Sequence, residues 1–179
     1  MGSPFTMGLV NVYMLEWEQK LLQHQNRHHE IYGRYIDDVF MTTNLSQEDI
    51  LKLLDETVTT YPNIKIIITI KQALEYLDTT IENDHEQLKT TTYHKSAWEP
   101  HVLPYESDHP RHVHNNTINN ALARAARICS TVEYFDMKLL STEMILLIND
   151  YPSKFIQQHI KDFFVKYDAM NVWTELNGQ

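Results

Sequence analysis

Two adjacent aspartates, Asp37 and Asp38, have the clearest potential for metal chemistry in this chain. They lie within residues 32–41, YGRYIDDVFM, between short aromatic and β-branched runs. Such runs favour strands and aspartate favours turns, so we predict a hairpin over residues 32–42 with both carboxylates at its tip. Magnesium prefers carboxylate oxygen, and paired divalent ions clamp the attacking and leaving oxygens of a phosphoryl transfer. The tip is a candidate metal site, although a solvated acidic turn would have the same sequence.

The number of aspartates that can bind a metal depends on the bend of the chain. Consecutive side chains of an extended strand point to opposite faces of the sheet. Unless the turn bends sharply, we therefore expect only one of Asp37 and Asp38 to coordinate an ion directly.

Two helices are predicted around this hairpin. Ser3 and Pro4 are typical of a helix start, and apolar residues then recur at helical spacing to about residue 24, which predicts a helix beneath the hairpin. Ser46 with Asp49 resembles a capping box and predicts a second helix. The side chains of this helix that we expect to face inward are Ile50, Leu51, Leu54 and Val58.

The following residues are predicted to be β-rich and then helical. Residues 64–70 form an isoleucine-rich strand, and residues 74–81 and 88–94 form a second hairpin. Residues 96–116 contain three prolines without clear periodicity and are predicted to be an ordered connector. Helical stripes follow from residue 118, over residues 132–148 with a break near Ser141, and after a cap at Ser153. The fold class is therefore α+β.

Composition indicates a folded protein without a membrane span. The chain has 179 residues, is 42% hydrophobic and contains only 4 glycines, which suits one domain or two small subdomains. Its longest apolar runs are far shorter than the roughly 20 residues that cross a bilayer. The single cysteine, Cys129, excludes an intrachain disulfide and fits a reducing, nuclear or cytoplasmic location, and no signal peptide is seen.

The net charge of -9 does not suit a general nucleic-acid-binding surface, which should be basic. The charge is unevenly distributed, because residues 85–130 are nearly neutral and rich in histidine while the remaining residues are strongly acidic. We expect weak binding of nucleic acid by the whole chain at physiological salt.

Several short motifs occur in a characteristic order. They are Gly2-Ser3-Pro4, Tyr35-Ile36-Asp37-Asp38, Tyr76-Leu77-Asp78, His94-Lys95, Ser107-Asp108-His109-Pro110, residues 124–130 (RAARICS) and Asn149-Asp150-Tyr151-Pro152. Together they resemble the C-terminal part of the reverse transcriptase of Penelope-like retroelements, from Gly2 to about Gln158. Each motif alone is weakly specific, but the ordered set is a strong indication of the family.

The resemblance implies a partial polymerase palm of antiparallel strands and packed helices, followed by a helical thumb. On this basis we expect residues 1–95 to be palm, 96–116 a connector, 117–168 the thumb-like subdomain and 169–179 a tail. The implied activity is RNA-directed DNA polymerisation with Mg²⁺ or Mn²⁺. The implied partners are an RNA or DNA template, a primer and deoxynucleoside triphosphates.

The resemblance also assigns roles to individual residues. Asp37 and Asp38 would be the catalytic metal ligands, with Asp37 favoured for direct coordination. Tyr35 and Ile36 would form the floor beneath the nucleotide, or would be buried strand residues. Gly2, Ser3 and Pro4 would border the templating base and the primer, or would only start a helix. Leu77 and Asp78 match the element that grips the primer.

Basic and histidine residues have competing interpretations. Arg124 and Arg127 share a helix face and would hold a nucleic-acid backbone or form a solvated cationic stripe. Lys65 or Lys71 would protonate pyrophosphate, although the motif aligns only loosely there. His24 with His28, and His109 with His112 and His114, have spacings that occur in zinc sites, but no acid or cysteine pattern completes either one.

One feature of the family is absent from this sequence. Such enzymes carry another metal-binding aspartate on a strand before the Gly-Ser-Pro block, where this chain begins. We therefore expect a truncated palm that does not polymerise DNA alone and that self-associates through exposed palm surface. The alternative is a non-catalytic interaction module that retains the polymerase fold.

Overall fold

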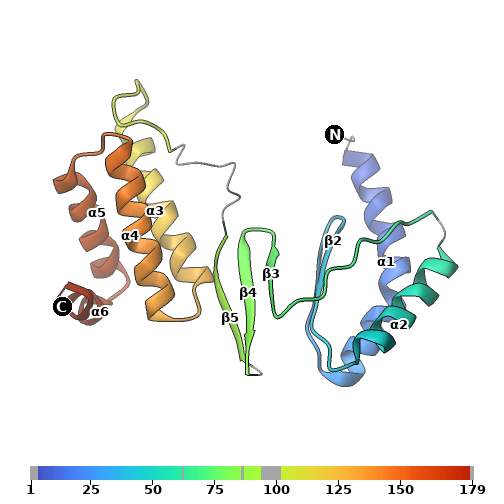
Figure 1. Ribbon diagram of the computed structural model, residues 1–179. Coiled ribbons are helices and arrows are strands. Elements are labelled where there is room, and N and C mark those ends of the chain that lie inside the picture. Colours follow the sequence, from blue (N-terminus) through green and yellow to red (C-terminus); the bar gives the residue numbers. More distant parts are fainter. Residues whose placement is uncertain (1–3, 62, 86, 94–101, 178–179) are drawn as a thin grey trace. The chain divides into compact units, whose positions relative to one another are not determined.

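The computed structural model describes residues 4–61, 63–85, 87–93 and 102–177 (Figure 1). Contacts divide the chain into two compact units, Met1–Lys71 and Gln72–Gln179. The expectations for Gly2, Ser3, His94 and Lys95 lie outside the described residues.

The first unit contains the predicted hairpin and both predicted helices. Helix α1 (Pro4–His28) is followed by β1 (Tyr32–Tyr35), β2 (Asp38–Met41) and α2 (Gln47–Thr60). The cap of α2 is confirmed, because the Ser46 hydroxyl accepts a hydrogen bond from the Asp49 backbone N–H at 3.2 Å and donates to the Asp49 carboxylate at 2.7 Å. The serine bond lowers the pKa of Asp49 more than the nearby Lys52 ammonium does.

A small core joins these elements. Trp17 and Leu21 of α1 and Ile50 and Leu54 of α2 are buried together, and half-buried residues of the hairpin pack against them. The expectation that α1 supports the hairpin is confirmed. The expectation for Leu51 is wrong, because its side chain is 40% exposed, whereas Ile50 and Leu54 do face inward.

The predicted strand at residues 64–70 is not formed. This segment has no regular secondary structure, and Ile67 is 95% exposed. A strand requires a hydrogen-bonded neighbour, and the sheets in the described part of the chain contain only β1 with β2 and β3 with β4 and β5. The isoleucines give this segment a high β propensity, but the described residues contain no strand that pairs with it.

The second unit begins with a three-stranded antiparallel sheet. It consists of β3 (Ala73–Tyr76), β4 (Thr79–Asp84) and β5 (Gln87–Thr92), in the order β3-β4-β5. The single strand predicted over residues 74–81 is therefore wrong, because the chain turns at Leu77 and Asp78 so that Tyr76 pairs with Thr79. The hairpin predicted before residue 88 is confirmed, with Asp84 opposite Gln87.

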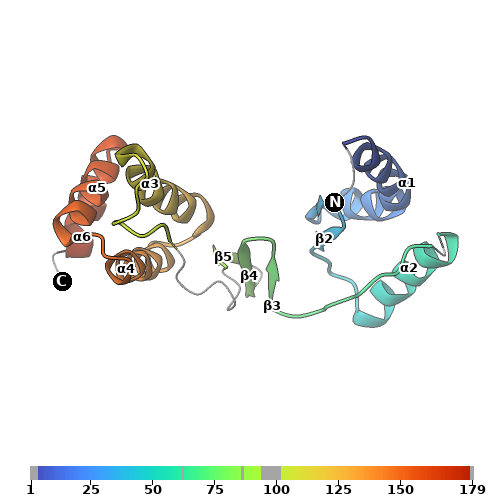
Figure 2. The same ribbon diagram turned by 90° about the horizontal axis from the view of Figure 1, so that it is seen from above.

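In the described part of the chain, four helices complete the second unit. They are α3 (Arg111–Ile128), α4 (Val132–Ile148), α5 (Ser153–Lys166) and α6 (Met170–Asn177). Helix α3 begins inside the predicted connector, and α6 lies in the predicted tail. Helix α4 continues through Ser141 without the expected break. The N-cap of α5 is Pro152 rather than Ser153. Figure 1 and Figure 2 both show α3, α4 and α5 side by side.

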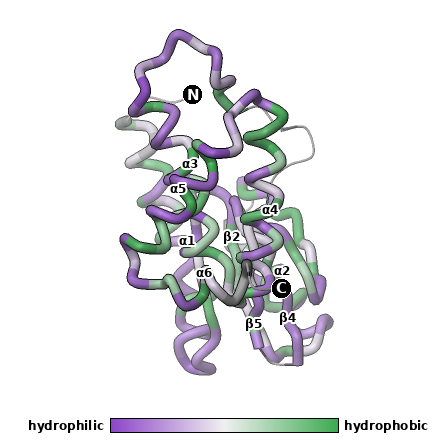
Figure 3. Tube along the Cα trace, turned by 90° about the vertical axis from the view of Figure 1, so that its left-hand side faces the viewer, coloured by the Kyte–Doolittle hydropathy of each residue, from purple (hydrophilic) through white to green (hydrophobic). Residues whose placement is uncertain are grey.

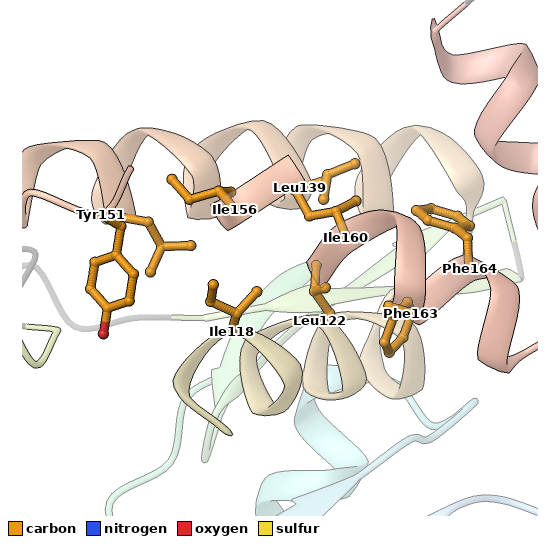
Figure 4. Packing of buried hydrophobic residues seen from close by; sticks show 9 residues of the cluster. Ile118, Leu122, Leu139, Tyr151, Ile156, Ile160, Phe163 and Phe164 are labelled. Carbon is orange, nitrogen blue, oxygen red and sulfur yellow. The ribbon is translucent and has the colours of Figure 1, made fainter. Parts of the chain in front are cut away.

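The larger hydrophobic core lies among these helices. Ile118 and Leu122 of α3 face Ile156 and Ile160 of α5, and Leu139 of α4 closes the cluster (Figure 4). The predicted stripes of α3 and α5 are confirmed at these positions, because each of these four α3 and α5 residues is no more than 1% exposed.

The small sheet is tied to this helical core. Thr90 of β5 and Ser130 after α3 exchange hydrogen bonds of 2.9 Å, from the Ser130 backbone N–H to the Thr90 carbonyl and from the Thr90 backbone N–H to the Ser130 hydroxyl. The Tyr134 hydroxyl of α4 donates to Glu82 of β4 at 3.3 Å. These bonds join the sheet to the helices, and the chain divides into its two compact units between Lys71 and Gln72.

Hydrophilic positions interrupt the hydrophobic ones along the trace (Figure 3). Among the described residues, none of the helices combines the length and apolar character that crossing a bilayer requires.

The absence of a buried strand at residues 64–70 can be tested by substitution. Ile67→Lys is expected to change the free energy of unfolding by no more than about 0.5 kcal/mol, as at an ordinary surface position. Ile66→Lys, at a half-buried residue packed on the first core, should destabilise the first unit clearly more. Urea denaturation of both variants checks this, and a large loss for Ile67→Lys would indicate a buried strand.

Candidate metal-binding hairpin

The tip of the first hairpin is a two-residue turn with an unusual backbone. Tyr35 pairs with Asp38, which leaves Ile36 and Asp37 as the loop. Ile36 has a φ of 57°, in the left-handed region that a β-branched residue rarely adopts. Such a conformation costs of order 1–3 kcal/mol and persists only where the surrounding structure imposes it.

Arg34 is the residue that holds this turn. Its Nη1 donates to the Ile36 carbonyl at 2.9 Å and to the Asn11 side-chain oxygen at 3.2 Å. Its Nε donates to the carboxylate of Glu18 at 2.8 Å. One guanidinium therefore links the strained turn to two positions on α1.

Glu18 is the buried partner of this contact. The residue is only 3% exposed, although it is charged, and it also accepts a 2.8 Å hydrogen bond from the Tyr32 hydroxyl. A buried carboxylate is tolerated when it is paired and hydrogen-bonded, and these two donors meet that requirement. The hairpin is thus attached to α1 by polar bonds as well as by the apolar core.

Asp37 and Asp38 are both exposed at the tip. Asp37 lies in the turn and Asp38 is the first residue of β2, so the chain bends between Tyr35 and Asp38 rather than running extended through both aspartates. The limit of one coordinating aspartate was expected for an extended chain, and the turn between Tyr35 and Asp38 is the sharp bend that removes this limit. Within the described residues, no group of three or more histidine, cysteine, aspartate or glutamate side chains is arranged to hold a metal.

The other candidate residues of the first unit, Tyr35, Ile36 and Pro4, differ in exposure and in the element to which they belong. Tyr35 is 57% exposed, so the interpretation that it is a buried strand residue is wrong. Ile36 is half-buried and belongs to the turn rather than to a strand. Pro4 is the first residue of α1, as the helix-start interpretation expected.

The fold brings three of four candidates of the second unit together and separates the fourth. Leu77 has a φ of 54° and lies with Asp78 in the turn between β3 and β4, which gives this hairpin the same form as the first one. The carboxylate of Asp78 forms an ion pair with Arg124 of α3, with 3.0 Å between Oδ2 and Nη2. Arg127 is exposed and has no such contact among the described residues; instead, it lines a cavity between the helices.

The surroundings of Arg124 are cationic as well. Burial lowers the pKa of Lys138 on α4, and the nearby Arg124 guanidinium lowers it further. The Nε of Arg124 is buried without a hydrogen-bond partner in the part of the chain that the structure describes. Asp78 therefore balances only part of this positive charge.

The histidine expectations are not supported by the fold. His114 is 4% exposed and its ring bonds to the Tyr151 hydroxyl at 3.2 Å, so it belongs to the helical core and cannot join His109 and His112 in a surface zinc site. The ring centroids of His24 and His28 lie 4.4 Å apart, with the rings tilted by 35°. The described residues do not supply the third ligand that a metal site would need. Lys65 and Lys71 are exposed on the irregular segment.

Glu18 and Arg34 support the tip but were not among the residues expected there. A signal for Glu18 was present, because it lies on the same helix face as Met14, Trp17 and Leu21. An acidic residue on an otherwise buried face needs a polar or cationic partner, and Arg34 in the adjacent hairpin was available.

Comparison with known proteins found one similarity. Residues 101–161 match the family described as animal helix-turn-helix domain, and this range covers α3, α4 and most of α5. No curated protein and no solved structure matches the chain.

The importance of the Glu18 contact can be measured. Glu18→Ala is expected to destabilise the first unit by about 3 kcal/mol, because it leaves the largely buried Arg34 without its counter-charge. Glu16→Ala is the control, since Glu16 is exposed on the same helix and should cost no more than about 0.5 kcal/mol. Amide hydrogen exchange of β1 and β2, together with urea denaturation, reports the difference. Equal effects of the two substitutions would contradict the proposed support.

Proposed function

We propose that this chain is the C-terminal palm and thumb portion of a reverse transcriptase resembling those of Penelope-like retroelements. In the complete enzyme it would extend a primer by two-metal nucleotidyl transfer. The observation that carries the proposal is the tip of the first hairpin, where two exposed carboxylates follow a residue held in a strained conformation. Backbone strain of this kind clusters at active sites and ligand clamps, where it forms part of the mechanism.

The chemistry assigned to the tip is the binding of Mg²⁺ or Mn²⁺. Asp37 and Asp38 supply oxygen ligands, and the bend at Asp37 lets both aspartates contribute. When bound, the ions would neutralise charge on the transferred phosphoryl group and activate the primer hydroxyl. The exposed ring of Tyr35 and the side chain of Ile36 would form the floor under the incoming nucleotide.

A complete two-metal site needs more acidic ligands than these two residues. None of the described residues adds a third one at the tip. We therefore expect the remaining carboxylate from another polypeptide segment and no templated synthesis by this chain alone. Addition of a segment with fingers and the rest of a palm should restore primer extension, and synthesis by the chain without it would overturn this part of the proposal.

The second unit is assigned to the template and primer. The similarity to a helix-turn-helix family supports this assignment, because helix-turn-helix units commonly contact nucleic acid. The incompletely balanced cations at Arg124 and Lys138 are suited to a phosphate backbone. The adjacent Leu77 and Asp78 turn would contact the primer, and Asp78 would orient Arg124 through their ion pair.

Within the matched range, α5 is better suited than α4 to face nucleic acid. Helix α5 presents two exposed lysines, Lys154 and Lys161, whereas its exposed amides Gln157 and Gln158 already donate to Glu143 and Asp162. Helix α4 instead exposes an apolar stripe at Met137, Leu140, Met144 and Leu147, each more than half exposed. Phosphate contacts come from basic and amide side chains, so α4 is not suited to this role.

A non-catalytic interaction module is the second candidate function. It is favoured by the apolar stripe of α4 and by a similar one on α1, where Phe5, Leu9 and Val12 are 75%, 56% and 65% exposed. Surfaces of this kind typically mark contacts with other proteins. Self-association through α1 would be compatible with either function.

Metal binding distinguishes the two candidates. Asp37→Asn is expected to weaken Mn²⁺ binding at the tip by about tenfold or more, because a charged ligand is lost. Asp55→Asn, at an exposed position of α2, is the control and should leave binding unchanged. Paramagnetic broadening of the β1 and β2 amide resonances measures both variants. Broadening that persists unchanged in Asp37→Asn would favour the interaction module.

Nucleic-acid binding tests the role of the second unit. Arg124→Gln should weaken the binding of a primer and template duplex and reduce the salt dependence of the affinity by about one charge. Lys20→Gln, on the exposed surface of α1, should change neither quantity. Fluorescence anisotropy at several salt concentrations provides the measurement. An unchanged salt dependence for Arg124→Gln would remove Arg124 from the proposed interface.

A further inference from the structure

A cavity in the second unit is not used by the proposed polymerase function. It has a volume of about 470 Å³ and lies where the end of α3, the start of α4, the end of α5 and the start of α6 meet. This size is within the range of small-molecule sites, which are roughly 300–1,000 Å³. Its walls combine aromatic rings with small side chains, because Phe135, Phe163, Phe164 and Tyr167 alternate with alanines.

The cavity contains a single formal charge. Among its lining residues only Arg127 is ionised, and the other polar groups are the Cys129 thiol and the hydroxyls of Ser130, Thr131 and Tyr167. Arg127 is exposed, and no ion pair to its guanidinium is found within the described ranges. A cation at the edge of an apolar cavity suits a ligand that has an apolar body and one negative charge.

The start of α4 does not compete with Arg127 for this charge. The Thr131 hydroxyl already accepts the Tyr134 backbone N–H at 3.3 Å. Glu133 accepts hydrogen bonds from its own backbone N–H and from Thr131, and these lower the pKa of its carboxyl. The backbone N–H groups of Glu133 and Tyr134 therefore already have acceptors, and a further anion there would meet the Glu133 carboxylate.

We propose that this cavity binds a small amphipathic carboxylate, such as a medium-chain fatty acid, with its chain among the aromatic rings and its carboxylate on Arg127. A monoanion fits better than a phosphate dianion, because Arg127 is the one cation among the described residues that line the cavity. The apolar walls would contribute affinity through burial of the hydrocarbon chain. This site is independent of metal binding at Asp37 and Asp38, so its failure would leave the proposed polymerase function intact.

Chemical modification of Cys129, the only cysteine of the chain, can test ligand binding at this cavity. Cys129 lines the cavity, so its rate of reaction with the neutral reagent 4,4′-dithiodipyridine reports occupancy of this site alone. Decanoate below its micelle concentration should slow the reaction in a saturable manner. Decan-1-ol, which has the same chain without the charge, should protect Cys129 more weakly.

Three variants give the proposal distinct outcomes. Arg127→Gln should raise the half-protecting concentration of decanoate by about tenfold and leave that of decan-1-ol unchanged, because only the charged contact is lost. Ala126→Trp, at an exposed helix position that lines the cavity, should fill it and abolish protection by both probes. Arg111→Gln, an exposed position at the other end of α3, is the control and should behave as the unmodified chain.

Circular dichroism verifies that each variant is folded. No protection of Cys129 by decanoate would overturn the proposal. Equal protection by the two probes, or equal loss of both with Arg127→Gln, would show an unselective apolar cavity and would overturn the carboxylate assignment. If Ala126→Trp does not fold, the comparison of the two probes with Arg127→Gln still decides the question.

Discussion

The buried ion pair between Glu18 and Arg34 is the contact on which the first unit depends. It joins the middle of α1 to the hairpin, and the same guanidinium binds the carbonyl of Ile36. Together with the pairing of Tyr35 and Asp38, this contact holds a β-branched residue in the left-handed region. A surface ion pair would contribute little, but this one is shielded from water on both sides, so its geometry is held firmly.

The second unit uses the same kind of hairpin for a different purpose. Leu77 repeats the backbone conformation of Ile36, and Asp78 follows it as Asp37 follows Ile36. Here the aspartate faces a cation from a helix, Arg124, and the sheet is fastened to the end of α3 through Thr90 and Ser130. The two turns therefore resemble each other locally but present their acids to different surroundings, since Asp37 is exposed to solvent and Asp78 is paired with a guanidinium. The polymerase proposal gives each of these surroundings a role.

The helical core and its cavity follow from the way that α3, α4 and α5 are joined. Their buried side chains fill the centre of the bundle, and Phe163 and Phe164 lie at the border between the filled core and the cavity lining. Alanines on α3 and before α6 are too small to close the remaining space. In this packing the outer face of α4 is exposed although it is apolar. Helices that are apolar on all faces are normally surrounded by protein. A partner surface on α4 would account for this composition.

The sequence by itself determined the elements whose signals are local. The Ser46 cap, the hairpin around Asp37 and the stripes of α3 and α5 were predicted because each depends on residues a few positions apart. Only the tertiary structure decided the contacts between distant residues, including the burial of Glu18 with Arg34, the pair of Asp78 with Arg124 and the placement of His114 in the core. The isoleucines of residues 64–70 illustrate the limit, since strand propensity cannot form a strand without a neighbour to accept its hydrogen bonds. Local chemistry selects the elements, whereas pairing and burial across the chain decide which of them form and what their side chains meet.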